Sequence, residues 1–65
     1  MLKTLIGLLF VTGGNILEVV DVRCDVPPTL TVRMVKVPEE GALSEEGAEW
    51  NIALDDLMSG WNPYE

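Results

Sequence analysis

The chain has one cysteine, Cys24, and no histidine in its 65 residues. One cysteine allows no internal disulfide, and the sequence has no cluster of metal ligands to hold a fold together. A chain of this length buries only about 60% of the surface that it exposes when unfolded. The fold therefore depends on a small hydrophobic core, or on a partner that extends this core. We predict a single small domain over residues 1–65.

The net negative charge comes from one half of the chain. Residues 1–38 contain three acids and four bases, whereas residues 39–65 contain eight acids and no base, so the halves carry +1 and −8 of a net charge of −7. A chain this acidic is not expected to bind nucleic acid or an anionic membrane directly. The apolar fraction of 48% is nevertheless that of a folded domain. The asymmetry indicates an interaction surface, or a face that only keeps the protein in solution.

The apolar segment 2–12 allows two folded interpretations. A lysine followed by apolar residues resembles the start of a signal peptide, but no cleavage site follows, and the run is too short to span a bilayer. Apolar residues at helical spacing, with Gly13 as a C-cap, favour a helix. Gly7 and the β-branched residues favour a strand that ends in a tight Gly13-Gly14 hairpin, and we prefer the strand. This strand would be apolar on both faces, and if one face is left uncovered, we expect it to bind a partner or a second copy of the chain as a homodimer.

The middle of the chain predicts two further strands. From Ile16 to Val26 the even positions are mostly apolar, and Pro27-Pro28 ends the strand. Cys24 lies on this apolar side, so we predict a buried thiol in a reducing compartment, consistent with a cytoplasmic protein. The segment from Thr29 to Val37 alternates as well. Its phase changes near Met34–Val35, which predicts a β-bulge.

The C-terminal segment predicts a helix. Ser44 is a suitable N-cap, Gly60 fits the position just beyond the last turn, and Pro63 follows as a stop. One apolar stripe on this helix is expected to pack on the sheet: Trp50, Ala53, Leu54, Leu57, Met58 and Trp61. We therefore predict an α+β fold, a three-stranded antiparallel sheet with one C-terminal helix packed on it. The element order is βββα, or αββα if the first segment is helical.

Most enzyme chemistry is excluded by composition. Without histidine the commonest general base and the Ser-His and Cys-His pairs are missing. Asp55 and Asp56 are adjacent, and neighbouring positions on a helix point about 100° apart, which makes a poor joint metal site. We predict a protein that is not an enzyme and needs no cofactor or metal.

The predicted helix places several acids on the side away from its apolar stripe. Glu45, Glu49 and Asp56 fall within about 40° of one another at 100° per residue. Ile52 projects among them, which suggests either a contact anchor or an isolated surface residue. The candidate partner-binding residues are Glu39, Glu40, Glu45, Glu46, Glu49, Ile52, Asp55 and Asp56.

This acidic run, from Glu39-Glu40 through Glu45-Glu46 to Asp55-Asp56, resembles in character the small acidic inhibitors of phages and mobile elements, especially anti-CRISPR proteins that mimic DNA. The resemblance implies binding to a CRISPR effector complex and blocking its access to target DNA, including the PAM. The residues themselves favour an inhibitor that occupies a basic, nucleic-acid-binding site on another protein. The alternative is a small acidic interaction subunit, or an antitoxin-like module, that docks on a basic patch unrelated to nucleic acid.

Overall fold

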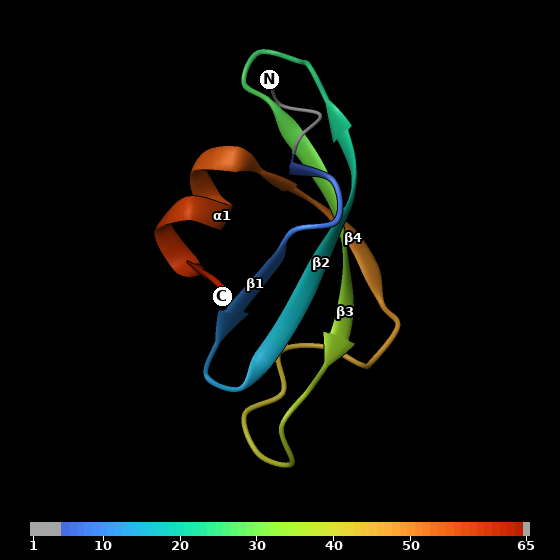
Figure 1. Cartoon of the computed structure of the whole chain (residues 1–65), viewed down its shortest axis with the longest axis vertical. Helices are drawn as coiled ribbons and strands as arrows, with labels where there is room; N and C mark the ends of the chain where they lie inside the picture. The colour runs from blue at the N-terminus through green and yellow to red at the C-terminus, as the bar shows by residue number, and fades with distance from the viewer. Residues whose placement is uncertain (1–4, 65) are drawn as a thin grey trace.

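The computed structural model describes residues 5–64 and has an α+β fold (Figure 1). Five antiparallel strands form one sheet in the order β4-β3-β2-β1-β5, and one short helix connects its two edge strands. The first four strands follow one another along the sheet, and the last returns to pair with the first. The elements are β1 (Leu9–Thr12), β2 (Asn15–Arg23), β3 (Thr29–Lys36), β4 (Glu49–Ala53), α1 (Leu54–Gly60) and β5 (Asn62–Pro63).

The hairpin β1–β2 turns at two glycines. Thr12 pairs with Asn15, and Gly13 and Gly14 between them have φ angles of 52° and 86°, which glycine adopts without steric cost. The predicted strand and its Gly-Gly hairpin are confirmed over residues 9–12, and the helical alternative, with its αββα order, is wrong there. Residues 5–7 form a turn instead of strand, and residues 2–4 lie outside the described residues.

Two irregularities in the β2–β3 ladder decide which side chains enter the core. Pairing passes from Leu17↔Met34 to Ile16↔Lys36, so Val35 is an extra residue and the predicted bulge is confirmed. A second shift lies between Val19 and Asp21 on β2. Because of it, the buried residues of β2 are the odd positions 15, 17 and 19 and then position 22.

The predicted inward face of β2 is therefore wrong for most of its length. The even positions were expected in the core, but position 22 is the only even one within β2 that is buried. Cys24 follows the end of β2 and is exposed, so the prediction of a buried thiol is wrong. Val26, the last even position of the expected strand, is fully exposed in the connection to β3.

The C-terminal half differs most from expectation, because the predicted helix is much shorter. Segment 44–48 consists of bends and turns, Glu49–Ala53 is strand β4, and only Leu54–Gly60 is helical. Gly47 has a φ of 88°, which lies outside the helical region and ends any continuation from Ser44. Gly60 is the last helical residue, and Pro63 belongs to β5.

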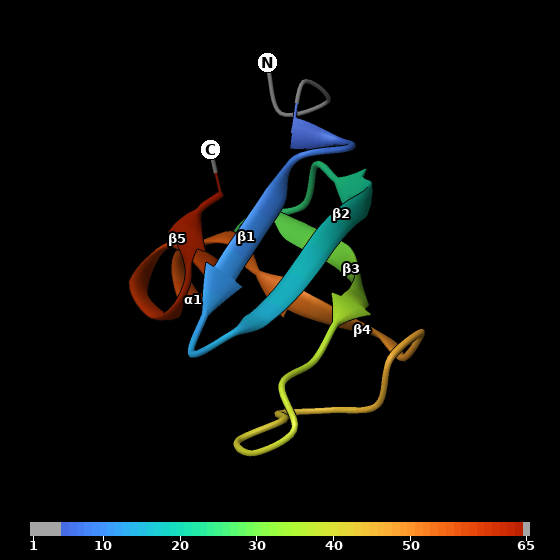
Figure 2. The ribbon, with the colours of Figure 1, turned by 60° about the horizontal axis from the view of Figure 1, so that its bottom comes forward.

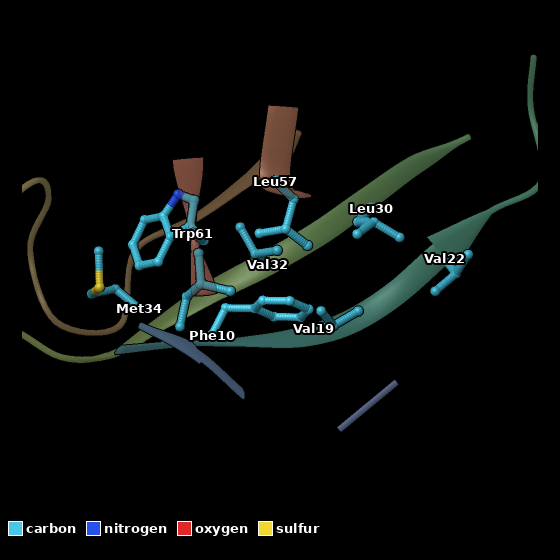
Figure 3. Close-up of a cluster of buried hydrophobic side chains, with 9 residues drawn as sticks. Phe10, Val19, Val22, Leu30, Val32, Met34, Leu57 and Trp61 are labelled. Carbon is cyan, nitrogen blue, oxygen red and sulfur yellow. The ribbon is translucent and has the colours of Figure 1, made fainter. Parts of the chain in front are cut away.

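The core lies between one face of the sheet and α1. Figure 3 shows Leu57 and Trp61 pointing toward side chains of β1, β2 and β3. Trp50 and Leu54 from the predicted helical stripe pack on the core from the side, whereas Met58 is 60% exposed and points away. The buried apolar residues are Phe10, Leu17, Val19, Val22, Leu30, Val32, Met34, Leu57 and Trp61.

Candidate partner-binding surface

The acids of the second half occupy three different settings. Four lie in the loop 37–48 between β3 and β4, one begins β4, and two lie in the first turn of α1. Every one of these seven residues is exposed. They are Glu39, Glu40, Glu45, Glu46, Glu49, Asp55 and Asp56, while Glu65 lies outside the described residues.

The loop 37–48 is held to the first hairpin by one buried side chain. Asn15 is 1% exposed, and its Nδ2 donates to the carbonyls of Thr12 and Gly41, at 3.1 Å each. Its Oδ1 accepts the backbone N–H of Leu43 at 3.0 Å. A buried amide with three partners satisfies most of its hydrogen-bonding capacity, so the middle of the loop has a defined position.

The backbone of Gly14 also lies close to the side chain of Pro38, which further fixes the position of the loop. A Cβ placed on Gly14 would lie 3.2 Å from the Cβ of Pro38, at the start of the loop. Glycine at this position therefore lets the loop rest against the hairpin turn. Figure 2 shows that the remainder of the loop extends beyond the end of the sheet.

Glu49 is partly neutralised by the chain itself. Its carboxylate accepts a hydrogen bond from Nε of Arg33 at 2.9 Å, across the β3–β4 ladder. Glu18 pairs with the same arginine from the other side, in the register of β2 and β3. Arg33 thus lies between Glu18 and Glu49 across three neighbouring strands. Because Glu49 is paired with this arginine, it adds little to the negative charge available to a partner.

The arrangement of Glu45, Glu49 and Asp56 on one face of one helix is wrong. They belong to a loop, a strand and a helix, because β4 replaces the middle of the predicted helix. The strand β4 lies between the loop acids and Asp55 and Asp56, and it is about 13 Å long from Glu49 to Ala53, at roughly 3.3 Å per residue. The surface therefore has two groups of acids, one in the loop and one at the start of α1.

The expected apolar anchor is also in a different place. Ile52 pairs with Leu30 and packs beside the core, so it does not project among the acids. Leu43 takes this position, because it is 63% exposed and lies in the loop between the pairs Glu39-Glu40 and Glu45-Glu46. Sequence reasoning missed both Leu43 and Asn15. The sequence signal that could have found them is Gly41, since glycine is typical of loops, and its φ of 84° in the structure fits this role.

Among residues 5–64, no group of three or more carboxylates and thiols lies close enough to hold a metal ion. Asp55 and Asp56 lie in the first turn of α1, where the helix dipole favours negative charge. No helix of the described chain has the length and apolar character needed to cross a membrane. What the surface offers is fixed negative charge together with an exposed leucine.

No family model matches the chain, and neither the curated proteins nor the solved structures compared with it include a match.

Proposed function

We propose that this protein is a non-enzymatic inhibitor that presents its acidic half to the basic, nucleic-acid-binding surface of a partner protein. The observation that carries the proposal is the loop 37–48, which has four exposed acids and no base and is held in position by Asn15. A groove that binds phosphates carries lysine and arginine, and it attracts any fixed array of carboxylates.

Fixation of the loop supports a binding role, because ordering a flexible loop costs free energy when a complex forms. Most connections in compact domains have about 4–6 residues, and an ordered connection as long as the loop 37–48 is more typical of a binding loop. A purely solubilising loop would need neither a buried asparagine nor a close approach to Gly14.

Leu43 supplies the contact that nucleic acid cannot make. An exposed apolar side chain with acids on either side of it in the sequence is consistent with the usual anatomy of an interface, an apolar centre within a polar rim. In this proposal the acids direct the encounter with a basic surface, and Leu43 enters a small apolar pocket there.

CRISPR effector complexes are the partners to test first, since the chain resembles anti-CRISPR proteins in character. The proposal for this partner is that the acidic surface blocks target DNA or its PAM from the effector. The blocking surface is not a single helical row of carboxylates. It consists of the loop acids together with Asp55 and Asp56.

The experiment is competition between this protein and a labelled target duplex for an effector complex. We expect Glu45→Gln combined with Glu46→Gln to weaken the competition by about ten-fold, because these carboxylates face the partner. The matched control combines Glu18→Gln with Asp25→Asn, which also changes the net charge from −7 to −5. This control is expected to change the competition by less than about two-fold.

Two results would contradict the proposal. One is an equal loss in both pairs of substitutions, which would make net charge, not the loop, responsible. The other is a complex whose affinity is unchanged by added salt, because exposed charges are screened at high ionic strength. A complex that holds this protein and the duplex together would favour the alternative, an acidic module that docks on a basic patch outside the nucleic-acid site.

A further inference from the structure

The strand β4 leaves one edge of the sheet open. It pairs with β3 on one side only, and it is the last strand in the sheet order. Apart from the carbonyl of Ala53, which as N-cap accepts the first hydrogen bond of α1, no backbone group of Glu49–Ala53 is bonded to a described residue outside β3. An edge of this kind presents a row of unpaired N–H and C=O groups to which another strand can add.

The opposite edge is protected by its sequence. The strand β5 consists of Asn62 and Pro63 alone. Very short edge strands and prolines are the means by which natural sheets avoid pairing with other chains, because proline has no N–H to donate. The two edges of this sheet are therefore not equivalent.

The hydrogen bonds at either end of β4 show which backbone groups are free. Met34 N–H donates to the carbonyl of Ala48, and Leu54 N–H donates to the carbonyl of Pro28. Because hydrogen bonding alternates along an antiparallel strand, Trp50 and Ile52 also direct their backbone groups to β3. The N–H and C=O groups of Glu49 and Asn51, and the N–H of Ala53, then point away from the sheet.

The polar side chains of β4 are held toward β3, away from this open edge. Oδ1 of Asn51 accepts a hydrogen bond from Oγ1 of Thr31 at 2.8 Å, and Glu49 is paired with Arg33. A charged side chain is a common protection of an edge strand, but here the only charge on β4 is engaged by its neighbour.

The acids on either side of β4 indicate which kind of segment can bind at its open edge. The strand β4 lies between two pairs of acids, Glu45-Glu46 before it and Asp55-Asp56 after it. No base follows Lys36 in the sequence. A second copy paired antiparallel about Asn51 would bring Glu46 toward Asp56 of that copy, each lying five residues from the centre, and like charges in opposed positions are destabilising. A basic segment would meet acids at both ends.

We infer that the open edge of β4 binds an extended, basic segment of a partner protein by strand addition. Main-chain hydrogen bonds to Glu49, Asn51 and Ala53 would supply affinity, and the alternate side chains would supply specificity. Residues on the face of Trp50 and Ile52 are expected to be apolar, and those on the other face lysine or arginine. The inference rests on the proposed function for its basic partner, and it adds the way in which that partner is held.

The probe is a short synthetic peptide of alternating lysine and valine, and the readout is amide hydrogen exchange in the intact protein. We expect the peptide to slow the exchange of the amides of Glu49, Asn51 and Ala53 by about ten-fold or more, because they gain hydrogen bonds. The amides of Trp50 and Ile52 are an internal control, since they already pair with β3. A peptide of alternating glutamate and valine should have no effect.

Two variants separate strand addition from simple attraction of charges. Asn51→Pro removes an outward N–H and keeps every acid, and Asn51→Ala loses the same hydrogen bond to Thr31 but keeps the N–H. We expect Asn51→Pro to bind the peptide about ten-fold more weakly than Asn51→Ala. The same lysine-valine peptide, N-methylated along its backbone, tests the wild-type protein even if Asn51→Pro does not fold.

Equal binding of the N-methylated peptide, or binding without protection of the three outward amides, would overturn the inference. Either result would leave the proposed function intact, because the acidic loop could still attract a basic surface. Conversely, the protein with Glu45→Gln and Glu46→Gln could lose its competition with the duplex and still bind the peptide by strand addition. This result would show that the acidic loop and the edge of β4 are separate binding sites.

Discussion

Asn15 and Leu43 are 28 residues apart in the sequence, yet the side-chain oxygen of Asn15 accepts the backbone N–H of Leu43 at 3.0 Å. This bond joins the first hairpin to the acidic loop and fixes the exposed leucine at a defined place. Asn15 is the one polar residue that is buried among the described residues. It thus determines the position of the surface that we propose binds a partner.

Asn15→Ala should destabilise the protein and release the loop. The substitution removes three hydrogen bonds and leaves their backbone partners unsatisfied, so we expect the free energy of unfolding to fall by about 2–4 kcal/mol. Urea denaturation measures this change. Asn51→Ala, which removes one exposed side-chain hydrogen bond, should cost less than about 1 kcal/mol and is the matched control. Equal losses in the two variants would contradict a special role for Asn15.

Gly14→Ala should be costly, and Gly60→Ala should not. An alanine at position 14 would need a φ of 86° and would place its Cβ 3.2 Å from that of Pro38. We expect a loss of about 1–3 kcal/mol in the free energy of unfolding. Gly60 has no heavy atom within 4 Å of an added Cβ and lies in a helix. Alanine there should leave the stability unchanged or raise it by up to about 1 kcal/mol. A thermal melt of each variant distinguishes the two cases.

Neighbouring residues of α1 should respond very differently to truncation. Leu57 is fully buried, so Leu57→Ala should lower the free energy of unfolding by about 2–5 kcal/mol. Met58 is 60% exposed, and Met58→Ala should change it by less than about 0.5 kcal/mol. Chemical denaturation of both variants tests which face of α1 meets the core. A larger loss at Met58 would mean that the helix is rotated relative to this structure.

The ion pair between Arg33 and Glu49 should contribute little to stability. Both side chains are about half exposed, at 47% and 49%, so water and salt screen their attraction. A double-mutant cycle with Arg33→Gln and Glu49→Gln should give a coupling free energy of about 0.2–1 kcal/mol. A value that exceeds this range and persists in high salt would show that the pair is shielded from solvent.

The strands in the first half could be predicted because they depend on local patterns. The glycine pair predicts the first hairpin, and the change of phase in β3 predicts the bulge at Val35. The inward face of β2 could not be predicted, because apolar residues occupy both of its faces, as at Leu17 and Val20. The bulge that follows Val19 is set by pairing with β3, a partner that no local pattern reveals.

The strand β4 was missed because its sequence satisfies two periods at once. Trp50 belongs to a helical stripe with Leu54 and Leu57, but Trp50 and Ile52 also alternate as in a strand. Pairing of β4 with β3 decides between them, and this is a long-range interaction. One local signal was available, since Gly47 would weaken a helix that begins at Ser44. The acidic composition of the candidate surface could be predicted, but its division into two groups could not.

The pairing of β5 with β1 has a consequence for how this chain is made. Phe10 lies opposite Pro63, and Tyr64 N–H donates to the carbonyl of Leu9 at 2.9 Å. During synthesis, β1 has no partner on its β5 side until residues 62–64 have left the ribosome. The hairpin of β1 and β2 can form earlier than the β1–β5 pairing, and contacts between residues so far apart in the sequence slow folding.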